Sequence, residues 1–333
     1  KTQKGPRLIA SEPSAHQWIQ QSICDWLMTR MSVCSLGNMI DLTDQTHSMK
    51  AALEASASGD FVTVDLSSAS DRLTGRLVEY IFQSRRDLLD AFHACRSRAL
   101  IDIFGELLLL KKFSTQGSAL TMPVQSICYA LLAQWAVMLS SGRTDDASAK
   151  WASLQVRVYG DDIIVPKYAY PVLSGLLKTC LLKVNVSKTH VNGFFRESCG
   201  MDAYAGIDVT PAYIRKFYSS APESLESVLQ CANNFHMKGL WRAAAHLLST
   251  VPEQECKLLP ILAIKQGDMS RIAEKRLEHV WDGLSLGSTA VLSFCGSSLL
   301  HPRSRRSEDL QKTQYRVLMV SAKVTMKTGD GNG

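Results

Sequence analysis

The stretch Tyr159-Gly-Asp-Asp162 lies between two short apolar segments and predicts the tip of a β-hairpin. Leu154–Val158 precedes it and is rich in β-branched residues, and Ile163–Val165 follows it. Gly160 supplies the backbone freedom that a tight turn needs. The hairpin therefore presents two neighbouring carboxylates at its tip, and the rest of the chain is interpreted around them.

Two adjacent carboxylates are costly unless something compensates their charge. At a separation of about 4 Å they repel by roughly 4 kcal/mol at an effective dielectric constant near 20. A bound cation would remove this cost, and oxygen-only ligands favour Mg²⁺ first and Mn²⁺ second. An ordinary solvated Gly-Asp-Asp turn is the alternative, and these four residues alone do not decide between the two interpretations.

Composition indicates a large, slightly basic intracellular chain. It has 333 residues, 46% apolar content and a formal net charge of +6, which is enough for a large core with two or three subdomains and suits an anionic partner. Nine cysteines without CxxC spacing indicate free thiols in a reducing compartment. The longest apolar run, Ile127–Leu139, is too short to span a bilayer. The first residue is Lys1, so we expect an upstream part to be missing.

Hydrophobic periodicity predicts a mixed α+β fold. Ser14 with Gln17 predicts a capping box at the first helix, and Trp18 and Trp26 are expected in the core. Residues 141–150 are expected to form a polar loop. Helices are predicted over 14–31, 44–57, 73–81, 86–100, 121–140, 171–182, 222–236, 239–250 and 252–265, strands over 61–65 and 183–186, and a hairpin over 101–113.

Three acids are expected to meet in one cluster. Asp65 ends a β-branched strand, and Asp161 and Asp162 occupy the hairpin tip. Three carboxylates with two Mg²⁺ ions make a two-metal site for in-line phosphoryl transfer. Lys188 lies in a polar turn further along the chain. This order of features predicts a nucleotidyl-transfer site.

Several longer motifs narrow this prediction to one family. The stretches are Val64-Asp-Leu-Ser-Ser-Ala-Ser-Asp71, Phe113-Ser-Thr-Gln-Gly117, Tyr159-Gly-Asp-Asp-Ile-Ile164, Lys188-Thr189, Phe195-Arg-Glu-Ser-Cys-Gly200, Gly206-Ile-Asp-Val-Thr-Pro211 and Tyr213-Ile-Arg-Lys216. Together they resemble the RNA-directed RNA polymerase, the replicase β subunit, of levivirus-type positive-strand RNA bacteriophages. The resemblance is strong from about residue 41 to residue 216.

The resemblance implies the fold of a right-hand polymerase. Its palm would be an antiparallel sheet flanked by helices, accompanied by partial fingers and a helical thumb. Residues 1–60 would be a residual fingers segment with a basic arm, and 61–216 the palm, with 72–113 partly a fingers insertion. Residues 217–333 would form the thumb and a basic tail. Family members carry a long upstream region with most of the fingers, which this sequence lacks.

The resemblance also implies roles for individual residues. Asp65, Asp161 and Asp162 would hold two Mg²⁺ ions, with Mn²⁺ as a substitute, and Lys188 would be the general acid for the leaving diphosphate. Nucleotide-binding residues would be Lys1, Lys4, Arg7, Ser70, Asp71, Gly117, Thr121 and Gln125. RNA-binding residues would be Ser114, Thr115, Tyr159, Gly160, Arg215 and Lys216, and residues 195–216 would support the primer strand.

The partners implied by the resemblance are a single-stranded RNA template, the nascent RNA, ribonucleoside triphosphates and the host translation elongation factors Tu and Ts, in the bacterial cytoplasm and without a membrane. Two alternatives stay open. A reverse transcriptase also uses a Tyr-x-Asp-Asp tip, although the small Ser70 near the sugar favours ribonucleotides. A non-catalytic RNA-binding or assembly fragment of a polymerase would need the basic patches but not the acids.

Overall fold

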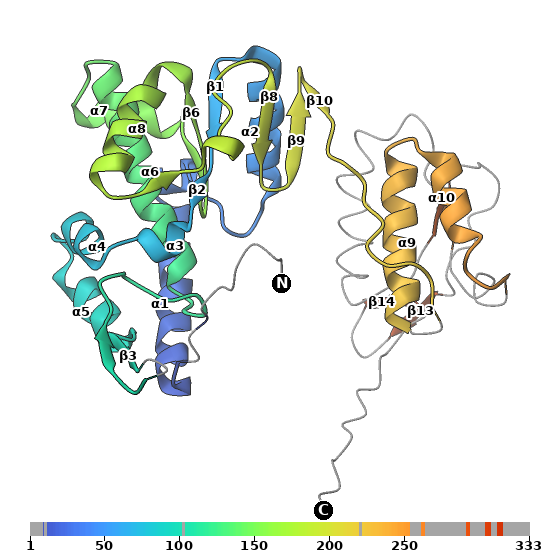
Figure 1. Cartoon of the computed structure of the whole chain (residues 1–333), viewed down its shortest axis with the longest axis horizontal. Coiled ribbons are helices and arrows are strands. Elements are labelled where there is room, and N and C mark those ends of the chain that lie inside the picture. The colour runs from blue at the N-terminus through green and yellow to red at the C-terminus, as the bar shows by residue number, and fades with distance from the viewer. Residues whose placement is uncertain are drawn as a thin grey trace, which may run out of the picture. The chain divides into compact units, whose positions relative to one another are not determined.

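The chain folds into two compact units, residues Lys1–Thr210 and Pro211–Gly333 (Figure 1). The computed structural model describes residues 9, 12–101, 104–219, 222–253, 261–263, 291–293, 304–307 and 312–315. The first unit contains the predicted acids, and the second begins within the segment expected to support the primer strand. Each unit is described by itself.

Helices supply most of the first unit. The α-helices are α1 (Ser14–Ser32), α2 (Thr46–Ser58), α3 (Ala69–Arg72), α4 (Gly75–Ile81), α5 (Arg86–Cys95), α6 (Thr121–Ser140), α7 (Asp146–Ser153) and α8 (Tyr170–Thr179). Short 3₁₀ turns are η1 (Ser35–Asn38), η2 (Lys167–Ala169) and η3 (Val186–Lys188). The α1, α2, α6 and α8 ranges confirm the helical periodicity of the sequence.

Small antiparallel sheets complete the first unit and confirm the α+β class. One sheet has the order β1 (Phe61–Val64), β6 (Asp162–Pro166), β5 (Arg157–Tyr159), and another has the order β10 (Ile207–Asp208), β9 (Met201–Tyr204), β8 (Phe195–Ser198). Two-stranded pairs join β2 (Leu66–Ser67) to β7 (Lys183–Val184), and β3 (Ala99–Ile101) to β4 (Leu107–Leu109). Helix α2 packs against β8 and β9, and α6 packs against β5 and β6.

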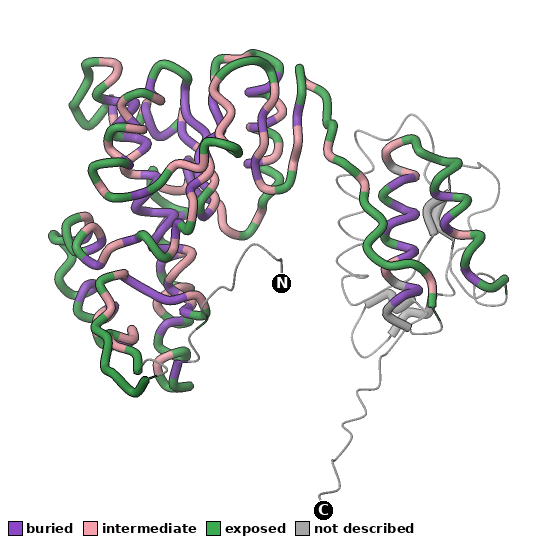
Figure 2. The backbone as a smooth tube through the Cα atoms, in the orientation of Figure 1, coloured by how far each residue is buried: buried purple, intermediate pink, exposed green. Residues whose placement is uncertain are grey.

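The main core forms around β1, β6 and α6, where buried residues are concentrated (Figure 2). Helix α6 is long and apolar enough to cross a membrane by length and composition, but 72% of its apolar window is buried inside the fold. Its small and apolar side chains, such as Ala130, Ala133 and Ala136, are fully buried. Helix α6 is thus the central core helix of this unit, against which the hairpin with the acids is packed.

Four local expectations are wrong. Ser14 begins α1 but does not cap it, because the N-cap position is Pro13 and no side chain caps the helix. Trp18 is 77% exposed and Trp26 is 39% exposed, so neither is a core residue. Helix α7 lies within the expected polar loop, capped by the Asp145 side chain that accepts from Ser148 N. The helix predicted over 86–100 ends at Cys95, and Ala99 and Leu100 belong to β3, so the expected hairpin with β4 begins before residue 101.

The second unit contains a compact pair of helices, α9 (Pro222–Met237) and α10 (Trp241–Leu248). Their buried apolar residues include Val228, Leu229 and Leu247. Four short strands are also described: β11 (Ile261–Ala263), β12 (Val291–Ser293), β13 (Ser304–Ser307) and β14 (Lys312–Tyr315). Strand β11 contradicts the end of the helix expected over 252–265. Most of that range, and most of the basic tail, lies outside the described residues.

Candidate active site

Sheet register places two of the three predicted acids opposite each other. Val64 of β1 pairs with Ile163 of β6, so Asp65 and Asp162 occupy the next opposing positions. Residues directly opposite in an antiparallel pair project to the same face and approach closely. Asp161 precedes Asp162 in the turn and interacts electrostatically with both. Asp65, Asp161 and Asp162 are therefore electrostatic neighbours in this structure, and their joint role as metal ligands stays a prediction.

The turn that contains Asp161 restricts substitution at Gly160, both by its backbone conformation and by the space around it. Tyr159 pairs with Asp162, which leaves Gly160 and Asp161 as the two central residues of the β5–β6 turn. Gly160 has φ +62°, as the first position of a type II′ turn requires. A Cβ atom there would lie 2.9 Å from Met122 Cε. Gly160 N–H also donates to Ser126 Oγ at 3.0 Å, which fixes the turn on α6.

A second hairpin turn holds the Asp162 carboxylate. Ser198 pairs with Met201, so Cys199 and Gly200 are the central residues of the β8–β9 turn, with φ of +50° and +79°. Positive φ at both positions is the type I′ pattern. In this conformation Cys199 N–H donates to Asp162 Oδ2 at 2.7 Å. The family resemblance implies primer support for this motif, and its contact with Asp162 is not apparent from the sequence.

Asp65 is held by the segment that follows β7. Asn185 Nδ2 donates to Asp65 Oδ2 at 2.6 Å, and Asn185 N–H donates to Asp65 O at 2.8 Å. Thr189 Oγ1 accepts from Asp65 N–H at 3.3 Å. Asn185 was missed from the sequence because nothing in its spacing distinguishes it from an ordinary turn asparagine. The three-residue turn η3 lies between Asn185 and Thr189 and contains Lys188.

Lys188 faces the acids and is paired with a further carboxylate. Lys188 Nζ lies 2.9 Å from Glu197 Oε1 of β8. This hydrogen bond is the main cause that raises the pKa of Lys188, and the charges of Asp65 and Asp162 raise it further. Their influence shows that the ammonium group lies near the acid cluster. Glu197 is part of a motif that the sequence analysis quoted, but it was not predicted as a site residue.

Burial and the charge of neighbouring acids raise the pKa of Asp65 and of Asp162. Burial is the largest cause that raises the pKa of Asp65 and of Asp162, and the charge of Asp161 raises both further. Hydrogen bonds from Asn185 and from Cys199 N–H act in the opposite direction. Strongly perturbed carboxylates that share one site are typical of functional centres. A divalent cation among them would relieve the repulsion.

The donor chemistry fits a hard divalent cation, because all three acids supply carboxylate oxygens. Asp65 and Asp162 each accept a hydrogen bond through Oδ2, from Asn185 Nδ2 and from Cys199 N–H. Within the described residues, no group of three or more His, Cys, Asp or Glu side chains is close enough to hold a metal ion. Binding by all three would therefore require the side chains to converge.

The predicted nucleotide-binding residues form contacts along β2, α3 and the loop before α6. Asp71 Oδ1 is paired with Lys112 Nζ at 2.7 Å. Gln116 Nε2 donates to Ser70 Oγ at 3.5 Å, so the loop that contains Gly117 lies beside α3. Lys112 was not predicted, although it stands immediately before the quoted Phe113–Gly117 motif.

The predicted residues around the start of α6 are largely buried and joined by hydroxyl contacts. Ser114 Oγ and Thr121 Oγ1 are 2.8 Å apart, and Thr121 Oγ1 donates to Thr115 O at 2.9 Å. Gln125 is 6% exposed, and its Oε1 is buried without a hydrogen-bond partner among the described residues. Gln125 Nε2 would lie 3.3 Å from a Cβ at Gly160, so this amide is next to the acid-bearing turn.

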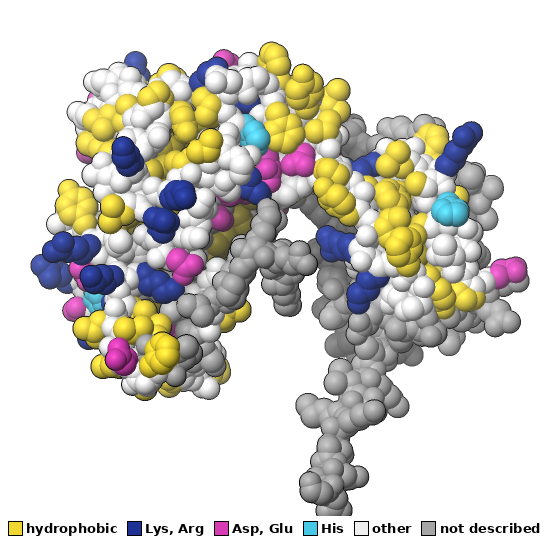
Figure 3. Space-filling view, in the orientation of Figure 1, with side chains coloured by type: hydrophobic (Ala, Val, Ile, Leu, Met, Phe, Trp, Pro, Cys, Tyr) yellow, Lys and Arg dark blue, Asp and Glu magenta, His cyan; other side chains and the backbone are white. Residues whose placement is uncertain are grey.

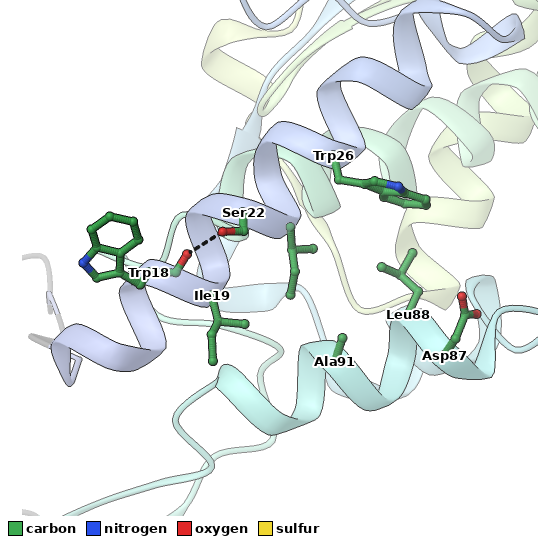
Figure 4. Close-up of a pocket in the computed structure, with 8 residues that line it drawn as sticks. Trp18, Ile19, Ser22, Trp26, Asp87, Leu88 and Ala91 are labelled. Atoms are coloured by element: carbon green, nitrogen blue, oxygen red, sulfur yellow. Dashed lines mark hydrogen bonds between the residues drawn. The ribbon is translucent and has the colours of Figure 1, made fainter.

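Some predicted residues are not brought to this cluster. Lys1, Lys4 and Arg7 lie outside the described residues. Ile9, which follows them, forms a parallel bridge with Gln116. Arg215 and Lys216 are exposed and belong to the second unit. An open groove of ≈ 640 Å³ lies between α1 and α5, where Ile19 and Ala91 face each other (Figure 4). None of the predicted site residues lines it.

Comparison with known proteins identifies the family. Residues 1–243 match the family described as RNA replicase, beta-chain. The chain belongs to this family. Among its relatives, the RNA-directed RNA polymerase subunit beta of Escherichia virus Qbeta is 35% identical over 299 residues, which are 88% of this chain and 46% of that protein. The RNA-directed RNA polymerase beta chain of Escherichia phage MS2 is 33% identical over 217 residues, 65% of this chain and 36% of that protein.

Two further facts bound what this membership means. The chain spans less than half the length of these replicase relatives. Among solved structures, telomerase from Candida albicans in complex with a fragment of telomeric RNA matches with 13% sequence identity and a TM-score of 0.43. The match covers 72% of this chain and 47% of the telomerase chain. That likeness is too weak to support a conclusion about this chain, so the replicase family rests on the sequence matches.

Proposed function

We propose that this chain carries the catalytic centre of an RNA-directed RNA polymerase that replicates a phage RNA genome. The observation that carries the proposal is the register of β1 and β6: its last pair is Val64 and Ile163, so Asp65 and Asp162 flank the end of this pairing, with Asp161 in the adjoining turn. Membership of the replicase β-chain family supports it, as does the arrangement of Lys188 beside these acids. The substrates would be an RNA template, its nascent strand and ribonucleoside triphosphates.

In the proposed reaction, the 3′-hydroxyl oxygen of the nascent RNA attacks the α-phosphorus of the incoming nucleotide. The new P–O bond replaces the bond to the bridging oxygen, and diphosphate leaves. The hydroxyl proton passes to solvent, and the Lys188 ammonium donates a proton to the diphosphate. Asp65, Asp161 and Asp162 would hold two Mg²⁺ ions, which supply charge stabilisation of the attacking and leaving oxygens when bound.

The proposed domain assignment follows the positions of these residues. Residues 61–216 would form the palm, with 72–113 partly a fingers insertion. Residues 1–60 would be residual fingers, and 217–333 the thumb with a basic tail. The nucleotide and template pocket would be lined by residues of α3, of the loop before α6 and of the first turns of α6: Ser70, Asp71, Gly117, Thr121 and Gln125. This assignment is supported by the site and by family membership.

The proposed setting is the cytoplasm of a host bacterium. A relative named a β chain belongs by its name to an assembly with other subunits. We propose that elongation factors Tu and Ts are such partners of this chain, and that Arg215 and Lys216 contact RNA. The +6 net charge supports an RNA partner.

The test is RNA synthesis on a primed single-stranded RNA, with ribonucleotides and Mg²⁺, in the presence and absence of elongation factors Tu and Ts. Wild type is compared with Asp161→Asn, and RNA binding is measured for both. We expect the substitution to reduce synthesis by about 10³-fold or more, because it removes a proposed metal ligand, while RNA binding is retained. Asp161 is exposed, so the substitution should leave the fold intact.

Each other outcome has a distinct meaning. Equal synthesis by both proteins would refute the assignment of the acids. RNA binding without synthesis by wild type, under every condition, would favour the non-catalytic RNA-binding alternative. Preferential use of deoxynucleotides in a parallel reaction would favour a reverse transcriptase.

A further inference from the structure

One carboxylate beside the acid cluster has no place in the function proposed so far. Glu197 lies on β8, directly opposite Asp202 of β9, so both side chains project from the same face of the hairpin. Acidic side chains gather at the ends of β8 and β9 that face the bottom of the view, with a histidine and a basic side chain beside them (Figure 3). Glu197 Oε1 contacts Lys188 Nζ at 2.9 Å.

The backbone of Glu197 is fixed from two directions. Its N–H donates to Thr63 Oγ1 of β1 at 3.3 Å. The preceding residue, Arg196, is fully buried and donates from its guanidinium to Phe61 O at 2.6 Å and Gly193 O at 3.0 Å. Glu197 is therefore attached to the same strand that ends at Asp65. A side chain anchored in this way can hold a mobile partner in a defined place.

Lys188 is the more exposed of the two partners. Its side chain is 51% exposed, whereas that of Glu197 is 29% exposed. Lysine has a long flexible stem and carries a compact charge, so an unattached ammonium group would sample many positions. The groups around it are Glu197 at 2.9 Å, His190 near Glu197 Oε2 at 3.9 Å, and the charges of Asp65, Asp162 and Asp202. The positive charge of Arg196, also on β8, lowers the pKa of His190, whereas the charge of Glu197 raises it.

We propose that Glu197 is a positioning residue that holds the Lys188 ammonium at the edge of the acid cluster during nucleotide addition. This inference rests on the proposed function, in which Lys188 donates a proton to diphosphate. Glu197 touches none of the reacting atoms and acts through Lys188. Its carboxylate restricts the ammonium group to a place near Asp65 and Asp162.

The first test requires no catalysis. Trace acetylation at pH 8.5, quantified by mass spectrometry, reports the free-amine fraction and access of Lys188, with Lys167 and Lys178 as internal references. We expect Glu197→Gln to raise Lys188 labelling by roughly threefold or more, which corresponds to half a pKa unit. Asp202→Asn is the matched control, because Asp202 faces the same side without a hydrogen bond to Lys188. Its effect should be smaller.

The second test measures nucleotide addition in single turnovers. Glu197→Gln should lower the rate about tenfold, a part of the 10²–10⁴ that a positioned proton donor contributes, with RNA affinity unchanged. Glu197→Asp, one methylene shorter, should recover part of the rate. In the Lys188→Ala background, Glu197→Gln should cause no further loss, because the two residues act as one unit.

The outcomes separate this proposal from the proposed function. Unchanged labelling of Lys188 in Glu197→Gln would overturn the pairing, whether or not the protein synthesises RNA. Increased labelling with a normal rate would overturn the positioning role. Additive losses in the double variant would overturn action through Lys188. Absence of synthesis by wild type would refute the proposed function and the role in nucleotide addition, while the labelling result would still report the pairing.

Discussion

Two hairpin turns meet at the acid cluster, and they contribute in opposite ways. The β5–β6 turn presents side chains, since Asp161 and Asp162 supply carboxylates. The β8–β9 turn presents backbone, since Cys199 N–H donates to Asp162 Oδ2. Both are two-residue turns with a left-handed residue at the first central position. The β5–β6 turn thus supplies the carboxylates, and the β8–β9 turn holds the Asp162 carboxylate in position.

The difference shows how the cluster can be both strained and ordered. Burial and like charges oppose ionisation of Asp65 and Asp162. Donors from Cys199 and Asn185 favour the ionised forms and fix their orientation. Binding of a cation would release this repulsion, while the two donors keep the Asp65 and Asp162 carboxylates oriented. Substitutions in the two turns should therefore have separable effects.

The largest effect on stability is expected from removing the anchor of the β8–β9 hairpin. Arg196 is fully buried, and its guanidinium donates to the carbonyls of Gly193, Phe195 and Phe61. Arg196→Met fills much of the volume but leaves these carbonyls without their donor. We expect a loss of about 2–5 kcal/mol in the free energy of unfolding, measured by urea denaturation.

The matched control is Arg72→Met. Arg72 is exposed and donates to one carbonyl, Leu181 O, at 3.3 Å, so its loss should cost less than about 0.5 kcal/mol. Equal effects of the two substitutions would show that the buried guanidinium does not anchor the hairpin.

A smaller but more local effect is expected in the turn that presents the acids. Gly160→Ala adds a Cβ at φ +62° and 2.9 Å from Met122 Cε. Left-handed backbone costs a non-glycine residue about 1–2 kcal/mol, and the methionine must also move. RNA synthesis should fall because Asp161 and Asp162 shift. Met122→Ala in the same chain should recover only the part due to the contact. Full recovery of stability by the double variant would contradict the requirement for positive φ.

The smallest expected effect on stability is an increase, caused by removing the charge of Asp162. The pKa of Asp162 is raised in the fold, chiefly by burial, so its ionisation destabilises the folded state as pH rises through that pKa. Asp162→Asn should therefore be more stable than wild type at pH 7 without divalent metal, although we expect it to lose RNA synthesis. The difference should shrink toward about pH 4, the ordinary range of aspartate. Denaturation at both pH values measures it.

A control with metal sharpens this prediction. Saturating Mg²⁺ should stabilise wild type and not Asp162→Asn, because a ligand that binds only the folded state shifts the unfolding equilibrium. A variant less stable than wild type at pH 7 in metal-free buffer would show that the Asp162 carboxylate is not electrostatically strained.

The sequence predicted the acids of this site and Lys188, but not the groups that hold them in place. The strand ending at Asp65 and the hairpin with Asp161 and Asp162 were visible, because β-branched runs and a glycine turn define them locally. Asn185, Cys199 and Glu197 were not, because their contacts with the acids and Lys188 arise from strand pairing far apart in the chain. A backbone N–H donor in particular leaves no residue type to detect.

Other predictions from the sequence were wrong where tertiary packing determines the exposure of a side chain or the formation of a helix. Trp18 and Trp26 have helical spacing that suggests a core face, yet they line an open groove between α1 and α5. Helix α7 has a polar sequence, and its formation depends on the Asp145 cap and on packing against α6. Helix α6 was predicted over its full range because a 20-residue apolar segment has few other structures in a folded core.

The most direct test of the account is metal binding by the acid cluster itself. Mn²⁺ binding is followed by electron paramagnetic resonance for wild type and Asp161→Asn, in the absence of RNA and nucleotide. The account predicts that wild type binds Mn²⁺ and that the substitution weakens binding by about tenfold or more. Superimposable isotherms for the two proteins would contradict the assignment of Asp65, Asp161 and Asp162 as a metal centre.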